Sequence, residues 1–130
     1  MERIMSGLET DLLRGEHPVI VATPEDDLEK AIGWFTGFDV HHLPVVNSLD
    51  DRALIGIVST VDALAYVAKH GTAKGATVGQ VMVRDPERIA PSTTIAHATQ
   101  ILAAATYQSL PVVDASGHCV GIVTVRDLVK

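Results

Sequence analysis

The sequence contains a single cysteine and few aromatic residues. Because Cys119 has no second cysteine to pair with, neither an internal disulfide nor a multi-thiolate metal site can form within one chain. Aromatic residues make up 4% of the chain against 47% hydrophobic residues, so Val, Ile, Leu and Ala must build the core. This composition favours sheets covered by helices. A lone thiol fits a reducing compartment, and we expect a cytoplasmic location.

Positive charge and long apolar runs are also scarce. Ten Lys and Arg residues are scattered among 16 Asp and Glu residues, and the net charge of −6 disfavours a nucleic-acid partner. No segment approaches the roughly 18 consecutive apolar residues of a membrane-spanning helix, so we expect no direct membrane insertion. The N-terminus, MERIMSGLETDLLRG, carries charges throughout and lacks the apolar run of a signal peptide.

Signatures of catalysis are missing from the sequence. There is no P-loop pattern, and no nucleophile with a base has a recognisable motif. Neighbouring residues on a strand face apart, so His41 and His42 are poorly placed to chelate together, and His118 is poorly placed to activate Cys119. We therefore expect a protein that is not an enzyme, holds no metal and requires no cofactor, with Cys119 as a packed thiol.

What the sequence does contain is a repeat of two halves. The run HLPVVN at residues 42–47 returns as SLPVVD at residues 109–114, an offset of 67. The run GIVSTVDAL at residues 56–64 returns as GIVTVRDLV at residues 121–129, an offset of 65. The second hairpin loop is therefore expected to be two residues shorter than the first.

Each half is expected to run short strand, helix, strand, turn, strand, helix. Helical apolar spacing occurs at matching positions of both halves, namely Leu28, Ala31, Trp34 and Phe35 in the first and Ile95, Ala98, Ile101 and Leu102 in the second. We expect Trp34 and Phe35 to belong to the core or to a dimer interface. The polar turns at residues 47–51 and 114–117, between β-branched runs, predict hairpins.

Helix boundaries have sequence signals of their own. Asp26, three residues before Glu29, is typical of an N-cap with a capping-box partner, and Thr93 has the matching place in the second half. Gly71 is expected to end the second helix of the first half.

The expected organisation has four parts: an N-terminal helix at 1–16, a first domain at 17–71, a linker at 72–80 and a second domain at 81–130. Ile4, Met5, Leu8 and Leu12 have helical spacing, and we expect their helix to pack on the second half, whose last helix is cut short at Lys130. The alternative is that the chain is a piece of a longer protein.

Two acidic residues and two hydroxyl residues form the candidate ligand site. Asp62 and Asp127 lie on the expected first turn of a helix, where a carboxylate can accept both hydroxyls of a ribose. Ser59 and Thr124 precede them at helix N-termini, where a hydroxyl and free backbone N–H groups can receive phosphate oxygens. The same pattern is also an ordinary capping box without any ligand, and this alternative stays open.

The repeated LPVV strand and GIV[S/T]xxD turn, together with VMVRDP at residues 81–86, resemble a tandem pair of cystathionine-β-synthase (CBS) domains over about residues 17–130. Val83 departs from the usual Thr. The resemblance implies an α+β fold of two pseudo-twofold-related β-α-β-β-α units with facing sheets. The clefts of such pairs often bind AMP, ADP, ATP or S-adenosylmethionine. Such pairs commonly form homodimers and act as sensors for an attached or partner effector protein.

The resemblance also extends the candidate ligand-binding set. In the family, basic residues just before Leu-Pro often reach phosphates; His41 and His42 stand there, against Gln108 and Ser109 in the second copy. Arg126 lies inside the second turn. Four further residues match positions that line the family's clefts: Thr23, Ala90, Pro44 and Pro111. Structural roles are the alternative for all of these residues.

Two other functions stay open at this point. The chain could be a ligand-free dimerisation or protein-interaction module, or the regulatory part of a larger enzyme, transporter or channel. Asp62 and Asp127 favour ligand sensing.

Overall fold

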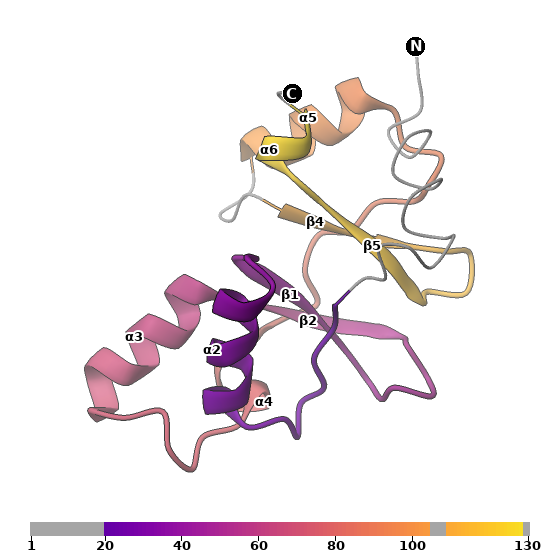
Figure 1. Cartoon of the computed structure of the whole chain (residues 1–130). Coiled ribbons are helices and arrows are strands. Elements are labelled where there is room, and N and C mark those ends of the chain that lie inside the picture. Colours follow the sequence, from indigo (N-terminus) through magenta and orange to yellow (C-terminus); the bar gives the residue numbers. More distant parts are fainter. Residues whose placement is uncertain (1–19, 105–108, 129–130) are drawn as a thin grey trace. The chain divides into compact units, whose positions relative to one another are not determined.

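The computed structural model describes residues 20–104 and 109–128, with only the backbone of Arg126 and Leu128. The described residues fall into two compact units, residues 20–85 and residues 86–128 (Figure 1). The predicted helix at 1–16 lies outside the described residues. The first unit contains α2 (Leu28–Gly37), β1 (His42–Val46), β2 (Leu54–Ser59), α3 (Thr60–His70), α4 (Val78–Val81) and β3 (Val83–Arg84). The second contains α5 (Ile95–Ala104), β4 (Ser109–Val113), β5 (Cys119–Thr124) and α6 (Val125–Leu128). The predicted α+β fold is confirmed.

The two predicted hairpins are present with the same register. β1 pairs antiparallel with β2 from His42↔Ser59 onward, and β4 pairs with β5 from Ser109↔Thr124 onward. Both ladders shift register near the end of their first strand, at Val45/Val46 and Val112/Val113. The loop of the second hairpin is shorter by two residues, as the changed offset predicts.

The first strand expected in each half is reduced to one parallel bridge, Ala22↔Val45 and Ile89↔Val112. The N–H of Ala22 donates to the carbonyl of Pro44 at 2.9 Å, and the N–H of Ile89 donates to the carbonyl of Pro111 at 3.0 Å. Proline has no backbone N–H to donate to a neighbouring strand. At Pro44 and Pro111 this causes no loss, because the hydrogen bond to the bridge uses the proline carbonyl oxygen as acceptor. Both prolines are buried, which supports their structural role.

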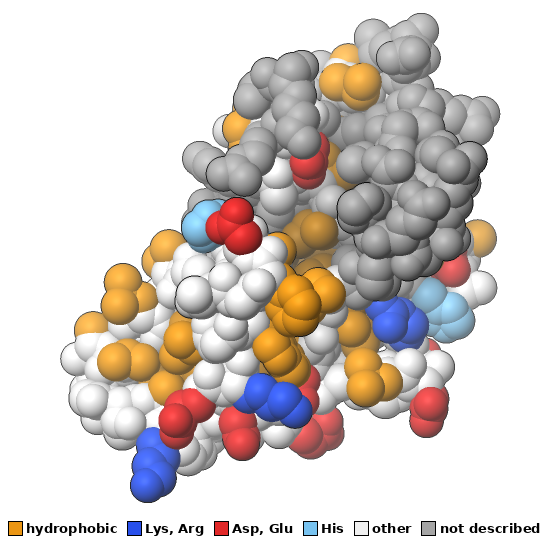
Figure 2. Space-filling model, in the orientation of Figure 1, with side chains coloured by type: hydrophobic (Ala, Val, Ile, Leu, Met, Phe, Trp, Pro, Cys, Tyr) orange, Lys and Arg blue, Asp and Glu red, His pale blue; other side chains and the backbone are white. Residues whose placement is uncertain are grey.

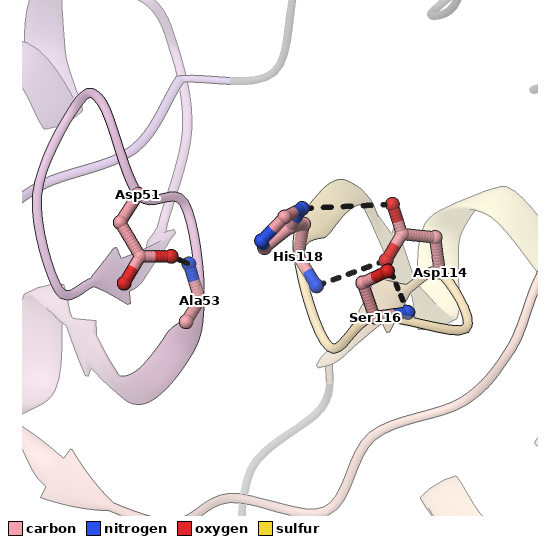
Figure 3. A network of polar contacts seen from close by, with 5 residues as sticks. All are labelled: Asp51, Ala53, Asp114, Ser116 and His118. Carbon is pink, nitrogen blue, oxygen red and sulfur yellow. Dashed lines mark hydrogen bonds and ion pairs between the residues drawn. The ribbon is translucent and has the colours of Figure 1, made fainter.

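An aspartate organises each hairpin loop (Figure 3). Asp51 accepts the N–H of Ala53 at 3.3 Å. Asp114 accepts the N–H groups of Ser116 at 2.9 Å and His118 at 3.0 Å, and its second oxygen lies 3.9 Å from Nδ1 of His118. These are the local side-chain to backbone bonds for which aspartate is favoured in turns.

The predicted N-caps Asp26 and Thr93 are wrong by one residue. α2 begins at Leu28 after Asp27, and α5 begins at Ile95. Asp26 instead accepts the N–H of Thr23 at 2.8 Å, and Thr93 accepts the N–H of Ala90 at 3.0 Å. Each of these side chains closes the turn before its helix, so it is not available to cap the helix itself.

The predicted apolar helix faces supply much of both cores. Leu28, Ala31 and Phe35 of α2 are buried, and Trp34 packs at the edge of the same cluster. Ala98 and Leu102 of α5 are buried in the second unit, but Ile95 is 39% exposed whereas its counterpart Leu28 is fully buried. The start of α2 is covered by the segment after α3, since the N–H of Leu28 donates to the carbonyl of Ala76. The described residues of the second unit include no such segment after α6.

The predicted linker is packed on the first unit. Gly71 ends α3 in the left-handed conformation, as predicted, with φ of 82°. Beyond it, Ala73, Ala76 and Val78 enter the core, and β3 joins the free edge of β2.

No helix among residues 20–104 and 109–128 is long and apolar enough to cross a membrane.

The junction of β2 and β3 yields a stability prediction. A Cβ added at Gly56 would lie 2.9 Å from the backbone carbonyl oxygen of Val83 and 2.9 Å from Sδ of Met82. Gly56→Ala should lower the free energy of unfolding by about 1–3 kcal/mol through overpacking. Gly33→Ala is the control: no neighbouring atom lies within 4 Å of its Cβ, and the helix should gain roughly 0.5–1 kcal/mol. Urea denaturation measures the free energy of unfolding of both variants. Equal changes in Gly56→Ala and Gly33→Ala would contradict the close approach of β3 to Gly56.

Candidate functional site

The end of β2 and the start of α3 are joined by a reciprocal capping box. Ser59 is the last residue of β2 and the N-cap of α3, and its hydroxyl accepts the N–H of Asp62 at 3.1 Å. Oδ2 of Asp62 accepts the N–H of Ser59 at 3.0 Å and its hydroxyl at 2.9 Å. This turn, which we call the first turn, therefore fixes the Asp62 carboxylate against the helix N-terminus.

The second half repeats this arrangement at the end of β5, and we call it the second turn. Oδ2 of Asp127 accepts the N–H of Thr124 at 2.8 Å and its hydroxyl at 3.0 Å. The N–H of Asp127 lies 3.4 Å from the Thr124 hydroxyl, a longer bond than its counterpart in the first turn. Four of the predicted site residues are thus brought together in two equivalent pairs.

The capping role predicted as the alternative for these residues is present in both turns, and it uses only one carboxylate oxygen. Among the described residues, Oδ1 of Asp62 and Oδ1 of Asp127 accept no hydrogen bond. A carboxylate oxygen has two acceptor sites. Each turn can therefore keep its cap and still accept a hydroxyl hydrogen bond from a bound molecule.

His42 lies beside the first turn. It begins β1, is half-buried and is the register partner of Ser59. His41 is exposed, and its carbonyl accepts the N–H of Thr60 at 3.0 Å. Burial lowers the pKa of His42 below its ordinary value of 6.5 and His41 lowers it further, while the Asp62 carboxylate acts in the opposite direction. At neutral pH this environment favours the uncharged form of His42.

Ser109 occupies the equivalent place beside the second turn, opposite Thr124. It is fully buried, and its hydroxyl has no hydrogen-bond partner within the described part of the chain. Sequence reasoning noted Ser109 only as a missing basic residue. The repeat offset already placed it opposite Thr124, but its burial depends on packing that the local sequence does not show.

Two other predicted site residues, Thr23 and Ala90, lie apart from the two turns. Ala22 pairs with Val45 in a parallel bridge, so Thr23 continues toward the loop end of β1, on the order of 10 Å from His42. Ala90 has the matching place in the second unit. Arg126 belongs to α6, next to Asp127, but its side chain is not described.

Cys119 and the acidic residues do not form a further centre within the described residues. No group of three or more His, Cys, Asp or Glu side chains is placed there to hold a metal ion. Cys119 is 2% exposed, and its thiol lies 3.5 Å from the carbonyl oxygen of Gly121. The predicted packed thiol is confirmed.

Two β-α-β-β-α units with matching capped turns define a tandem-repeat module. The sequence model of the CBS domain matches residues 11–69 and 78–130, so the chain belongs to the CBS domain family. This confirms the resemblance inferred from the repeated motifs. The matched segments divide the chain near α4, whereas the compact units divide after residue 85.

The curated relatives include an inosine-5′-monophosphate dehydrogenase from Thermoplasma acidophilum. It is 36% identical over 121 residues, which are 93% of this chain and 22% of the relative. A similar enzyme from Korarchaeum cryptofilum is 34% identical over 110 residues, 85% of this chain and 21% of the relative. The chain thus spans about a fifth of the length of these relatives.

Solved structures share the fold. The CBS-pair protein CBSX2 of Arabidopsis thaliana, solved in complex with AMP, is 30% identical with a TM-score of 0.73, covering 85% of this chain and 84% of that chain. The CBS domain pair of protein MJ0100, in complex with 5′-methylthioadenosine and S-adenosyl-L-methionine, is 24% identical with a TM-score of 0.76 and covers 85% of both chains. The second likeness concerns the fold alone.

The lowered pKa of His42 predicts a pH-dependent stability. The unfolded imidazole takes up a proton near its ordinary pKa, whereas the folded one does so only at lower pH. The unfolded state therefore holds more protons in this window, and the free energy of unfolding should fall as the pH drops from about 7.5 to about 5.5.

Urea denaturation of the wild type and of His42→Ser across this range tests the prediction. In His42→Ser the free energy of unfolding should fall less on acidification than in the wild type. In the control His97→Ser, which changes an exposed histidine, it should fall as much as in the wild type. Identical pH dependence in the wild type and His42→Ser would contradict it.

Proposed function

We propose that this chain is a regulatory module that binds an adenosyl ligand at its two capped turns and transmits binding to an effector protein. The observation that carries the proposal is the geometry of Asp62 and Asp127. Each carboxylate is held by its own helix cap and keeps one oxygen without a hydrogen bond among the described residues. That oxygen is suited to accept from a ribose hydroxyl.

The backbone of each turn is suited to the anionic part of such a ligand. Ser59 and Thr124 stand at helix N-termini, where N–H groups and the helix dipole favour an anion. The AMP complex of CBSX2, a protein 30% identical to this chain, supports an adenine nucleotide as the ligand. S-adenosylmethionine is a second ligand to test, since it occurs with the MJ0100 pair.

In this proposal the chain binds a ligand and does not catalyse a reaction. The dehydrogenase relatives carry a matching segment in about a fifth of their length, which supports a regulatory role for that segment. In this proposal the effector is an attached domain or a separate protein, and the module acts in the cytoplasm. The rival function is a ligand-free interaction module with the same fold.

Calorimetric titration with AMP, ADP, ATP and S-adenosylmethionine tests ligand binding. The wild type should bind at least one of them, and Asp62→Ala or Asp127→Ala should weaken binding by about tenfold or more, because a charged acceptor is lost. Loss of the cap also destabilises each variant by about 1 kcal/mol.

Thr94→Ala is the matched control, since the Thr94 hydroxyl accepts the N–H of His97 at 3.2 Å at the start of α5. It should lose similar stability and keep its affinity. Absence of binding to all four ligands would favour the interaction module.

We further propose that the chain self-associates through the face formed by α2 and α3. A groove of about 380 Å³ runs between these helices, lined by Ile32, Phe35, Thr36, Thr60, Ala63, Leu64 and Val67. Val61 and Leu64 of α3 are 71% and 68% exposed, and Figure 2 shows hydrophobic side chains at the surface in this region. The lining carries no charge, so a second copy can approach here despite the net charge of −6.

Leu64→Glu should shift the chain from dimer to monomer, because the buried contact would have to desolvate a carboxylate. Leu49→Glu is the control, since Leu49 is 67% exposed in the β1–β2 loop, outside the groove. Light scattering after size exclusion measures the mass of each variant. A monomeric wild type, or a dimeric Leu64→Glu, would exclude this face as the dimer interface.

A further inference from the structure

A groove of about 330 Å³ lies along α5 in the second unit, and none of its described lining residues belongs to either turn. Its lining residues are Glu87, His97, Gln100, Ile101 and Ala104. The four residues of α5 are spaced i, i+3, i+4 and i+7, so they share one face of the helix. Ile101 is half-buried and packs against the second core, whereas the other lining residues are exposed. The groove therefore has an apolar floor at Ile101 and a largely polar rim.

The repeat shows which side chains stand at the equivalent place in the first unit. The offset of 67 pairs Ile101 with Trp34 and Glu87 with Ile20, and the matching parallel bridges of the two units have the same offset. Trp34 and Ile20 both pack against the first core. The first unit therefore has a large indole of its own where the second unit has the smaller side chain of Ile101.

The charged groups around this place also differ between the units. Nζ of Lys30 lies 5.4 Å from the centroid of the Trp34 ring, a cation–π contact. The counterpart of Lys30 in the second unit is His97, and the counterpart of Ile20 is the carboxylate of Glu87. The second unit thus lacks both the aromatic ring and the cation that the first unit carries in its own chain, and it adds an acidic group.

The Glu87 carboxylate is available for a cation from outside the chain. Among residues 20–104 and 109–128 it makes no hydrogen bond or ion pair. Neither Lys nor Arg occurs in the described lining of the groove. Nε of the neighbouring Arg88 donates to the carbonyl of Pro86 at 3.2 Å. The rim of the groove is therefore complementary to a positive group.

We propose that this groove is a docking site for a segment of the effector protein that presents an aromatic side chain next to a Lys or Arg. The aromatic ring lies against Ile101, at the place that the Trp34 indole takes in the first unit, and the cation pairs with Glu87. This inference rests on the proposed function, because it supplies the recognition of the effector that this function requires.

The chemistry of the groove favours such a segment over the adenosyl ligand. Aromatic residues and Arg are enriched at the centres of protein interfaces, where an apolar floor and a polar rim are usual. The phosphates of a nucleotide would lie beside the Glu87 carboxylate without any Lys or Arg of the described lining. A cation–π contact or an exposed ion pair is weak alone, so the ring and the cation act together.

The probe for this site is the N-acetylated and C-amidated peptide Lys-Trp-Ala-Lys, titrated into the isotope-labelled full chain and followed by amide NMR. It should shift the signals of Gln100, Ile101 and Ala104 saturably. Replacement of the peptide Trp by Ala should abolish these shifts. Replacement of both peptide Lys residues by Glu should weaken binding about tenfold, because attraction to Glu87 becomes repulsion.

Two variants of the chain test the groove itself. Ile101→Trp installs the residue of the first unit and should abolish peptide binding, because its indole occupies the groove. Glu87→Gln should weaken binding about threefold, as expected for an exposed ion pair, and it leaves the core untouched. Glu29→Gln is the matched control, since it removes an exposed carboxylate of α2 in the first unit and should leave the affinity for the peptide unchanged. All three variants should keep the affinity of the wild type for AMP.

The outcomes separate this inference from the proposed function. Absence of shifts at the groove, or equal binding of the charge-reversed peptide, in a protein that still binds an adenosyl ligand would overturn the docking site alone. Nuclear Overhauser contacts of Ile101 with residues 1–19, or with a second, differently labelled copy, would assign the groove to the chain itself and would also overturn it. Peptide binding in a protein that binds no adenosyl ligand would support the docking site and overturn the proposed ligand sensing.

Discussion

The contact between an aspartate carboxylate and the hydroxyl residue three positions before it holds the strand-to-helix turns together. Ser59 is at once the last residue of β2 and the N-cap of α3, so the direction of α3 is set by a residue that the sheet already fixes. Helix N-caps of this kind stabilise by about 1 kcal/mol. The exposed face of α3, the groove beside α2 and the position of Asp62 all depend on where this helix begins.

The same atoms give the turns a structural role and a capacity for binding. In each turn Oδ2 is committed to the cap and Oδ1 is not, so a ligand does not have to break the fold in order to bind. A ligand that binds only the folded turn also stabilises it by mass action. Stability and affinity are therefore coupled at Asp62 and Asp127. A variant that loses a helix cap elsewhere is needed to separate a loss of affinity from a loss of stability.

Much of the fold could be predicted from the sequence because the signals are local and repeated. The hairpins, the loop that is two residues shorter, the helical cap at Gly71 and the buried thiol of Cys119 all follow from short motifs. The N-caps were misplaced because Asp26 and Thr93 can cap either the helix or the preceding turn, and only the turn is used. The packing of residues 72–85 on the first unit was missed because a segment rich in Gly and Ala gives no periodic signal of burial.

The candidate site could also be predicted only in part. Motif spacing located both capped turns, but it could not show which carboxylate oxygen each cap uses, or that Ser109 is buried while His42 is only half-buried. The β1–β2 and β4–β5 ladders keep one register although residues 42 and 109 differ, because the backbone bonds do not depend on the side chain at the strand end. A duplicated fold can therefore hold its geometry through Ser or Thr and Asp in both halves and still vary the charge beside each turn. Divergence at these positions changes the group beside a turn while the capping atoms stay the same.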